Sequence, residues 1–139
     1  MICRIFENGT LLNYKYSVVL SSYNGKTMLG RHRERDTWEM QGGHIEANET
    51  PLEAARRELY EESGALEFIM QPLCDYLTVT DNGNAGAAGM VFAAEIKKLG
   101  ILPDFEIAEV KLFDELPDNL TYPELTRILF DYLKNNNKN

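Results

Sequence analysis

The stretch from Thr50 to Gly64 carries clear helix start and stop signals and constrains the fold more than any other part of the chain. Its first residues, Thr-Pro-Leu-Glu, combine an N-cap threonine, a proline at the first helical position and a capping-box glutamate. Gly64 tolerates the left-handed geometry that follows a last turn. The sequence therefore predicts a helix over 51–63, with Leu52, Ala55 and Leu59 as a buried stripe.

The opposite face of this helix carries three glutamates, Glu58, Glu61 and Glu62, spaced i, i+3 and i+4. Because a helix turns once every 3.6 residues, these carboxylates project from one patch and repel one another. A solvated acidic face is one interpretation. The other is a site for a divalent cation, and an oxygen-only donor set favours Mg²⁺ or Mn²⁺ over Zn²⁺.

The remaining hydrophobic pattern predicts strands alternating with two helices. Asn24-Gly25 is typical of a two-residue hairpin turn, and Thr121-Tyr122-Pro123-Glu124 predicts the start of a second helix. This combination favours an α/β or α+β sandwich in which the helices cover a mixed sheet. Strands are expected near 14–22, 26–33, 66–80, 89–97 and 107–113. The second helix should bury Leu125, Ile128, Leu129, Tyr132 and Leu133, and the glycine-rich run 81–89 is expected to be a flexible connection.

Length and charge narrow the function classes. The 139 residues fit one domain over 1–139, with a polar tail at 134–139. With 22 acidic against 14 basic residues, the formal charge of −8 argues against a sequence-independent grip on duplex nucleic acid. A phosphate-bearing ligand would need a cation as intermediary. No apolar run reaches the roughly 18–20 residues of a membrane span, and no secretory signal is visible, so we expect a soluble, cytoplasmic protein. Cys3 and Cys74 have no metal-site spacing and are expected to be small buried residues.

The residues around the three glutamates form a longer pattern. From Gly43 to Ala65 the chain has a glycine, five residues, Glu49, seven residues, and then Arg-Glu-Leu-Tyr-Glu-Glu-Ser-Gly-Ala. This stretch resembles the signature of the Nudix hydrolases, G-x5-E-x7-R-E-U-x-E-E-x-G-U, where U is a bulky aliphatic residue. All seven fixed letters match, while Ala65 is small for the last aliphatic position. The family often has proline where this chain has Gln41.

The resemblance implies an α/β/α sandwich with a central mixed sheet and the hydrolysis of a diphosphate linkage in a nucleoside diphosphate joined to a group X. A MutT-like activity, which converts a normal or oxidised nucleoside triphosphate to the monophosphate and pyrophosphate, is the leading hypothesis. The alternatives are ADP-ribose, sugar-nucleotide or dinucleoside polyphosphate cleavage, and a non-catalytic nucleotide-sensing module. The expected partner is a small nucleotide, and the sequence leaves homodimer formation open.

The resemblance also implies roles for individual residues. Glu58, Glu61 and Glu62 would hold Mg²⁺, with Mn²⁺ as a substitute, and the carbonyl of Gly42 would complete the ligand set. Glu49 and Arg57 would lock the preceding loop onto the helix through paired hydrogen bonds.

The candidates for the general base and for substrate contacts come from both inside and outside the signature. Glu58 is the first candidate for the general base, Glu106 and Glu109 are candidates from outside the signature, and Glu95 is a further alternative. Arg31, Gly42 and Gly43 are candidates for substrate binding, with Arg31, followed in the same run by Arg33 and Arg35, facing the phosphates. Trp38 would pack in the core or wall the pocket, with the core favoured.

Overall fold

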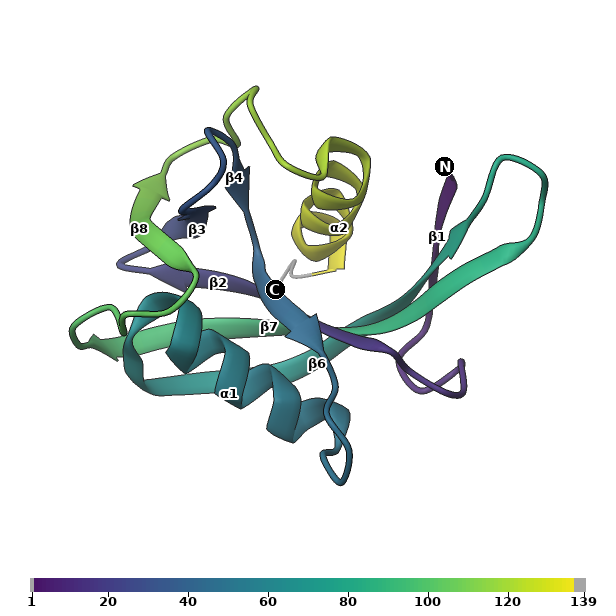
Figure 1. Cartoon of the computed structure of the whole chain (residues 1–139), viewed down its shortest axis with the longest axis horizontal. Coiled ribbons are helices and arrows are strands. Elements are labelled where there is room, and N and C mark those ends of the chain that lie inside the picture. The colour runs from purple at the N-terminus through teal and green to yellow at the C-terminus, as the bar shows by residue number, and fades with distance from the viewer. Residues whose placement is uncertain (1, 137–139) are drawn as a thin grey trace.

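Two helices lie on opposite faces of one mixed sheet in the computed structural model, which describes residues 2–136 apart from the side chain of Ala85 (Figure 1). In chain order the elements are β1 (Ile2–Phe6), β2 (Tyr16–Tyr23), β3 (Lys26–His32), β4 (Trp38–Glu39), β5 (Gln41–His44), α1 (Pro51–Ser63), β6 (Ala65–Val79), β7 (Ala85–Leu99), β8 (Ile107–Phe113) and α2 (Pro123–Asn136).

The sheet is organised around β2. Its strands follow the order β1-β6-β7-β2-β3-β4, with β5 also pairing with β2 and β8 with β3. β2 pairs in parallel with β7, whereas the other strand pairs are antiparallel. Along the other edge of β2, residues 16–19 pair with β5 and residues 21–23 pair with β3. One strand therefore contacts three others, and its far edge forks between β3 and β5.

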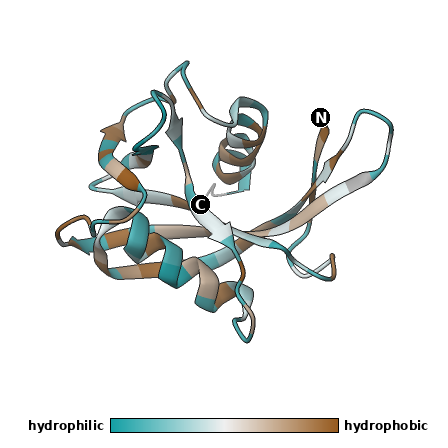
Figure 2. Ribbon diagram, viewed as in Figure 1, coloured by the Kyte–Doolittle hydropathy of each residue, from teal (hydrophilic) through white to brown (hydrophobic). Residues whose placement is uncertain are grey.

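Side chains of β2 alternate between two apolar clusters, because successive residues of a strand point to opposite faces. Val19 packs in the cluster that includes Leu59 of α1, whereas Val18 and Leu20 pack in the cluster that includes Leu129 of α2. Figure 2 shows hydrophobic stretches on the strands that lie between the helices. The predicted sandwich with a mixed central sheet is confirmed.

Helix α1 has the predicted ends. The Thr50 hydroxyl accepts a hydrogen bond from the backbone N–H of Glu53, whose carboxylate accepts one from the N–H of Thr50. Gly64 follows with φ of 82°. The prediction for Leu52 is wrong, since it is 44% exposed. The buried line steps by four residues through Ala55, Leu59 and Ser63, and one step further back reaches position 51 rather than 52.

Most of the predicted strands and the hairpin are confirmed, with ends shifted by a few residues. Asn24 and Gly25 both have positive φ, as the predicted turn requires. The short strands β1, β4 and β5 were not predicted. The connection expected over 81–89 is wrong in its second half, because β7 begins at Ala85 and the turn is closed by a hydrogen bond from Thr80 N–H to the carbonyl of Asn84.

The second helix begins at Pro123, close to its predicted start. Leu129 is fully buried, but Ile128 is 36% exposed, so its predicted burial is wrong. The buried face turns instead toward Thr126 and Phe130. Residues 134–136 of the expected polar tail form the end of α2, and the rest of the tail lies outside the described residues.

Two further expectations concern cysteine and tryptophan. Both cysteines are free thiols. Cys74 is buried as predicted, whereas Cys3 is only partly buried. Trp38 packs against the α2-side cluster, with its ring edge-on to that of Phe113 at a centroid distance of 5.2 Å, which confirms the core interpretation. Within residues 2–136, no helix has the length and apolar character needed to cross a membrane.

Candidate active site

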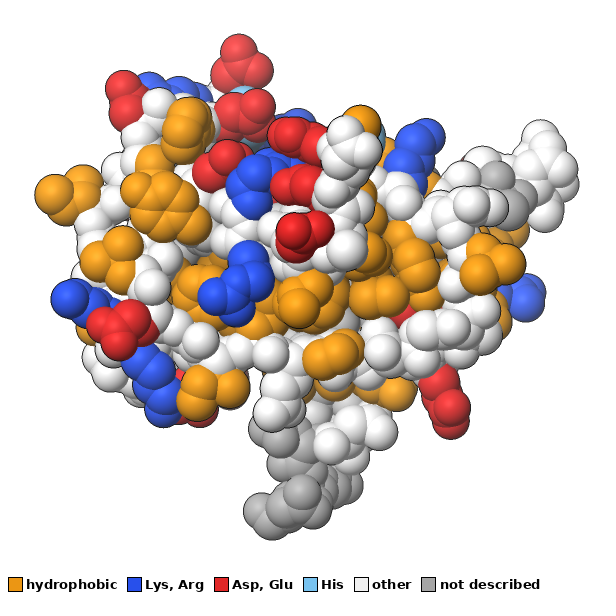
Figure 3. All heavy atoms as spheres, turned by 90° about the horizontal axis from the view of Figure 1, so that it is seen from below, with side chains coloured by type: hydrophobic (Ala, Val, Ile, Leu, Met, Phe, Trp, Pro, Cys, Tyr) orange, Lys and Arg blue, Asp and Glu red, His pale blue; other side chains and the backbone are white. Residues whose placement is uncertain are grey.

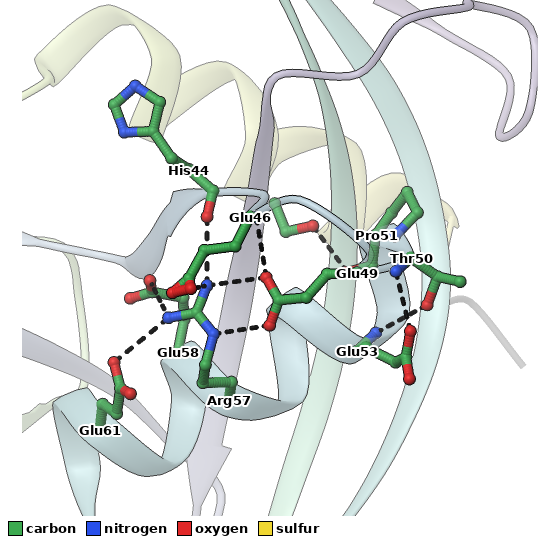
Figure 4. A network of polar contacts seen from close by, with 10 residues as sticks. His44, Glu46, Glu49, Thr50, Pro51, Glu53, Arg57, Glu58 and Glu61 are labelled. Atoms are coloured by element: carbon green, nitrogen blue, oxygen red, sulfur yellow. Dashed lines mark hydrogen bonds and ion pairs between the residues drawn. The ribbon is translucent and has the colours of Figure 1, made fainter.

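Arg57 lies at the centre of a polar network on α1 (Figure 4). Its guanidinium donates to both carboxylate oxygens of Glu49, from Nε at 2.7 Å and from Nη2 at 3.0 Å. Nη2 also donates to the carbonyl of His44 at 3.2 Å. The hydrogen bonds from Arg57 lower the pKa of Glu49 to about 2, and those same bonds raise the pKa of Arg57. The structure thus brings Glu49 and Arg57 together and ties the loop before the helix to the helix itself.

The third guanidinium nitrogen of Arg57 faces the acidic patch. Nη1 donates to Glu58 at 2.8 Å and to Glu61 at 3.3 Å. Figure 3, which views the molecule from below, shows acidic and basic side chains gathered together on one part of the surface, with apolar side chains around them. One cation therefore orients two of the three candidate metal ligands.

Gly42 and Gly43 of β5 lie against the other parts of this patch. The N–H of Gly42 donates to Oε1 of Glu62 at 2.8 Å. A Cβ on Gly42, whose φ is +155°, would lie 2.6 Å from the carbonyl oxygen of Ser17. A Cβ on Gly43 would lie 2.7 Å from Oε1 of Glu58. Gly42 needs glycine because its backbone approaches that of β2, whereas a side chain at Gly43 would displace the carboxylate of Glu58.

Burial and mutual repulsion disfavour the charged forms of Glu58 and Glu62. Burial raises the pKa of Glu62 to about 8, with Glu58, Glu39 and Glu106 adding to the rise and the N–H of Gly42 opposing it. Burial also raises the pKa of Glu58, against the opposing effect of Arg57. An oxygen-only set of this kind fits a hard divalent cation, which would relieve the repulsion.

Each of the three carboxylates accepts a hydrogen bond from a neighbouring group of the protein. Among residues 2–136, no three Asp, Glu, His or Cys side chains converge closely enough to hold a metal ion. In this arrangement Arg57 donates to Oε1 of Glu58 and of Glu61, while the N–H of Gly42 donates to Oε1 of Glu62.

A cleft of about 760 Å³ opens beside Gly42, Gly43 and Glu62, between the sheet and the start of α2. Arg35 lines it together with the carboxylates of Glu39, Glu106 and Glu124. Its aromatic lining comprises Tyr16, His44, Tyr76 and Tyr122, and the rings of Tyr16 and His44 lie 4.6 Å apart. The cleft is therefore lined by both carboxylates and aromatic rings.

Of the candidates for the general base from outside the signature, one lines this cleft and two do not. Glu106 lines it, with Oε2 lying 3.6 Å from Nε2 of His32. Glu109 pairs instead with Arg31, whose Nε lies 2.9 Å from its carboxylate, and neither residue lines the cleft. Glu95 lies beside Lys97 on β7, also outside the lining.

The arginine in the cleft is Arg35, which was not selected from the sequence. Its Nη1 lies 3.1 Å from Glu39, while the neighbouring Arg33 bonds to Asp104 and to the carbonyl of Phe105. Arg31, Arg33 and Arg35 occur in one basic run, and nothing in that run indicates which of them reaches the cleft. His32 and the aromatic residues of the lining were also missed, because they come from separate strands and loops whose convergence no local pattern indicates.

Comparisons with known proteins identify the family of this chain. The NUDIX domain family model matches residues 13–126. This chain is 34% identical to the putative 8-oxo-dGTP diphosphatase YtkD of Bacillus subtilis over 108 residues, which are 77% of the chain. It is also 44% identical to an RNA pyrophosphohydrolase of Bartonella henselae over 77 residues. These alignments cover 66% and 44% of the relatives, less than two thirds of their length.

Similarity in structure extends over more of the chain. A crystal structure of a mutant of the Bacillus subtilis pyrophosphohydrolase BsRppH superimposes with a TM-score of 0.81 at 25% identity, covering 97% of this chain and 91% of that one. The chain belongs to the Nudix hydrolase family.

Proposed function

We propose that this protein is a Mg²⁺-dependent pyrophosphohydrolase that converts a nucleoside triphosphate to the monophosphate and pyrophosphate. The observation that carries the proposal is the position of Glu62. This residue lines the cleft beside Gly42 and lies on the same helix patch as Glu58, which Arg57 orients. Nudix hydrolases generally use divalent metal ions. The oxygen-only patch is consistent with Mg²⁺, and Mn²⁺ has the same ligand preference.

Glu58, Glu61 and Glu62 would hold the ion. When bound, it would neutralise phosphate oxygens and lower the pKa of the attacking water. Arg57 holds Glu58 and Glu61 in place through hydrogen bonds from its guanidinium, and the N–H of Gly42 holds Glu62. A carboxylate must accept the proton of the water as its oxygen attacks phosphorus and the bridging P–O bond breaks. Glu58 remains the first candidate, and Glu106 is the outside candidate that lines the cleft.

The aromatic residues that line the cleft support a nucleotide as the substrate. Tyr16, His44 and Tyr122 line the cleft, and bases stack on aromatic side chains of this kind. Two relatives are named for 8-oxo-dGTP and for RNA, which makes a nucleotide with a 5′-triphosphate the substrate class of first choice. The charge of −8 weighs against an extended nucleic-acid surface and favours a free nucleotide over a long RNA.

The proposal is tested by incubating the protein with Mg²⁺ and a substrate panel. The panel contains normal and oxidised nucleoside triphosphates, 5′-triphosphorylated RNA, ADP-ribose, sugar nucleotides and dinucleoside polyphosphates, and product identity locates the cleaved bond. We expect pyrophosphate release from a triphosphate, and at least about 100-fold slower release by Glu61→Gln and Glu62→Gln.

A matched control is Glu67→Gln, which removes an exposed carboxylate on β6 and should leave the rate unchanged. Equal release by the unsubstituted protein and both helix variants would defeat the catalytic assignment. Tight nucleotide binding without any release would instead favour the sensing module. Comparing Glu58→Gln with Glu106→Gln separates the two candidates for the base.

A further inference from the structure

The fork between β3 and β5 leaves a gap in the sheet beside β2. Val19 is the last residue of β2 that pairs with β5, and Ser21 is the first that pairs with β3. Buried backbone and hydroxyl groups at such a branch need other hydrogen-bond partners, because no ladder continues across it.

The side chain of Gln41 occupies this fork. It begins β5, is only 1% exposed, and lies among residues of the α1-side face. Its Nε2 donates to the carbonyl of Met28 on β3 at 3.2 Å, and its Oε1 accepts the hydroxyl of Ser21 on β2. Ser21 and Met28 are themselves 2% and 1% exposed. One buried amide therefore links the three strands that meet at the branch.

The next peptide group in the chain takes part in the acidic site. The N–H that donates to Glu62 belongs to the peptide bond between Gln41 and Gly42. Gly43, one residue further on, lies under Glu58. The hydrogen bonds of the Gln41 side chain consequently fix the start of β5, and with it the position of the backbone that contacts Glu62 and Glu58.

From this arrangement we infer that Gln41, held by Ser21 and Met28, is a positioning residue for metal binding by Glu58 and Glu62. The inference rests on the proposed function, because it takes those glutamates as metal ligands. An apolar side chain would fill the same volume but leave the Ser21 hydroxyl and the Met28 carbonyl without this partner. The amide specifies the direction of the strand, which packing alone does not.

The test is the affinity of the nucleotide-free protein for Mn²⁺, measured by calorimetry or by the paramagnetic signal of the free ion. We expect Gln41→Leu to raise the Kd for Mn²⁺ by about 10- to 100-fold, the range typical for lost partners of metal ligands. Ser21→Ala, which leaves the bond to Met28, should raise it several-fold. Cys74→Ala is the matched control, because it opens a small cavity on the other face of the sheet without touching the fork.

The outcomes separate positioning from general loosening. An unchanged Kd in Gln41→Leu overturns the inference, and so does an equal rise in Cys74→Ala. If Gln41→Leu does not fold, Ser21→Ala decides the matter, and an unchanged Kd in that variant is the overturning result. Failure of the unsubstituted protein to bind Mn²⁺ would overturn the proposed function, and this inference with it.

Discussion

The two faces of the sheet hold their helices in different ways. Under α1, the apolar cluster around Leu59 is joined by polar bonds, among them one from the Ser17 hydroxyl to the carbonyl of Pro51 at 2.7 Å. Under α2 the packing is almost entirely apolar, and among the buried side-chain oxygen and nitrogen atoms of the described residues only Thr126 Oγ1 lacks a hydrogen-bond partner. The difference teaches that polar bonds fix the orientation of the helix on the α1 side, where the candidate metal ligands lie, while the α2 side supplies apolar burial and borders the cleft.

The largest expected effect on stability comes from the apolar face. Leu129→Ala removes a fully buried side chain from α2 and should lower the free energy of unfolding by about 2–5 kcal/mol. Because Leu129 lies across the sheet from the glutamates, kcat should change little at a temperature where the variant is folded. Urea denaturation and steady-state kinetics measure the two quantities. A tenfold fall in kcat would show that the faces are not separable.

A backbone substitution on the α1 side should have a smaller effect on stability but a larger one on activity. In Gly42→Ala the new Cβ would meet the Ser17 carbonyl in a conformation with φ of +155°, at a cost of about 2 kcal/mol. Because the same residue directs Glu62, turnover should also fall by at least about tenfold. The matched control is Gly25→Ala, which also has positive φ but no atom within 4 Å, and which should cost about 1 kcal/mol with unchanged turnover.

The pairing of Glu49 with Arg57 predicts a sensitivity to acid. The pKa of Glu49 falls from its ordinary 4.5 to about 2 in the folded protein. The pair therefore stabilises the folded state above about pH 4.5, and this contribution is lost as the pH falls toward 2. Urea unfolding in this range should show a shallower decline of stability for Glu49→Gln than for the unsubstituted protein. Identical slopes, or the same change in the control Glu67→Gln, would contradict the assignment.

The smallest expected effect concerns Arg31. Its ion pair with the half-exposed Glu109 contributes about 0.5 kcal/mol, and the side chain does not line the cleft. Arg31→Ala should therefore change the KM for a nucleoside triphosphate less than about threefold. A tenfold rise in KM would mean that phosphates reach Arg31 after all, and the role implied by the family resemblance would be restored.

The parts of the fold that were predicted from the sequence depend on neighbouring residues. The capping box, the glycine after α1 and the Asn24-Gly25 turn each contain their own cause within four residues. Strand β5 could not be found in this way. Its sequence is Gln-Gly-Gly-His, which has low strand propensity, and it is a strand only because β2 pairs with it.

The same limit applies to the site. Glu58, Glu61 and Glu62 share a patch because helical spacing puts them there, and Arg57 reaches two of them from the same helix. The cleft instead combines residues from β2, β6 and the start of α2, such as Tyr16, Tyr76 and Tyr122. Their convergence depends on strand order, which no local pattern encodes. The candidate metal ligands could therefore be predicted from the sequence, and the residues that line the cleft could not.

The parallel pairing of β2 with β7 also sets an order of events during synthesis. Residues 16–23 of β2 can pair with residues 89–96 of β7 only after those later residues have been synthesised. The hairpin of β2 with β3 and the glutamate helix are complete in sequence long before that. Contacts between distant segments form slowly, so a nascent chain carries α1 for some time before it has β7, whose Phe92, Ala94 and Ile96 complete the apolar cluster under that helix.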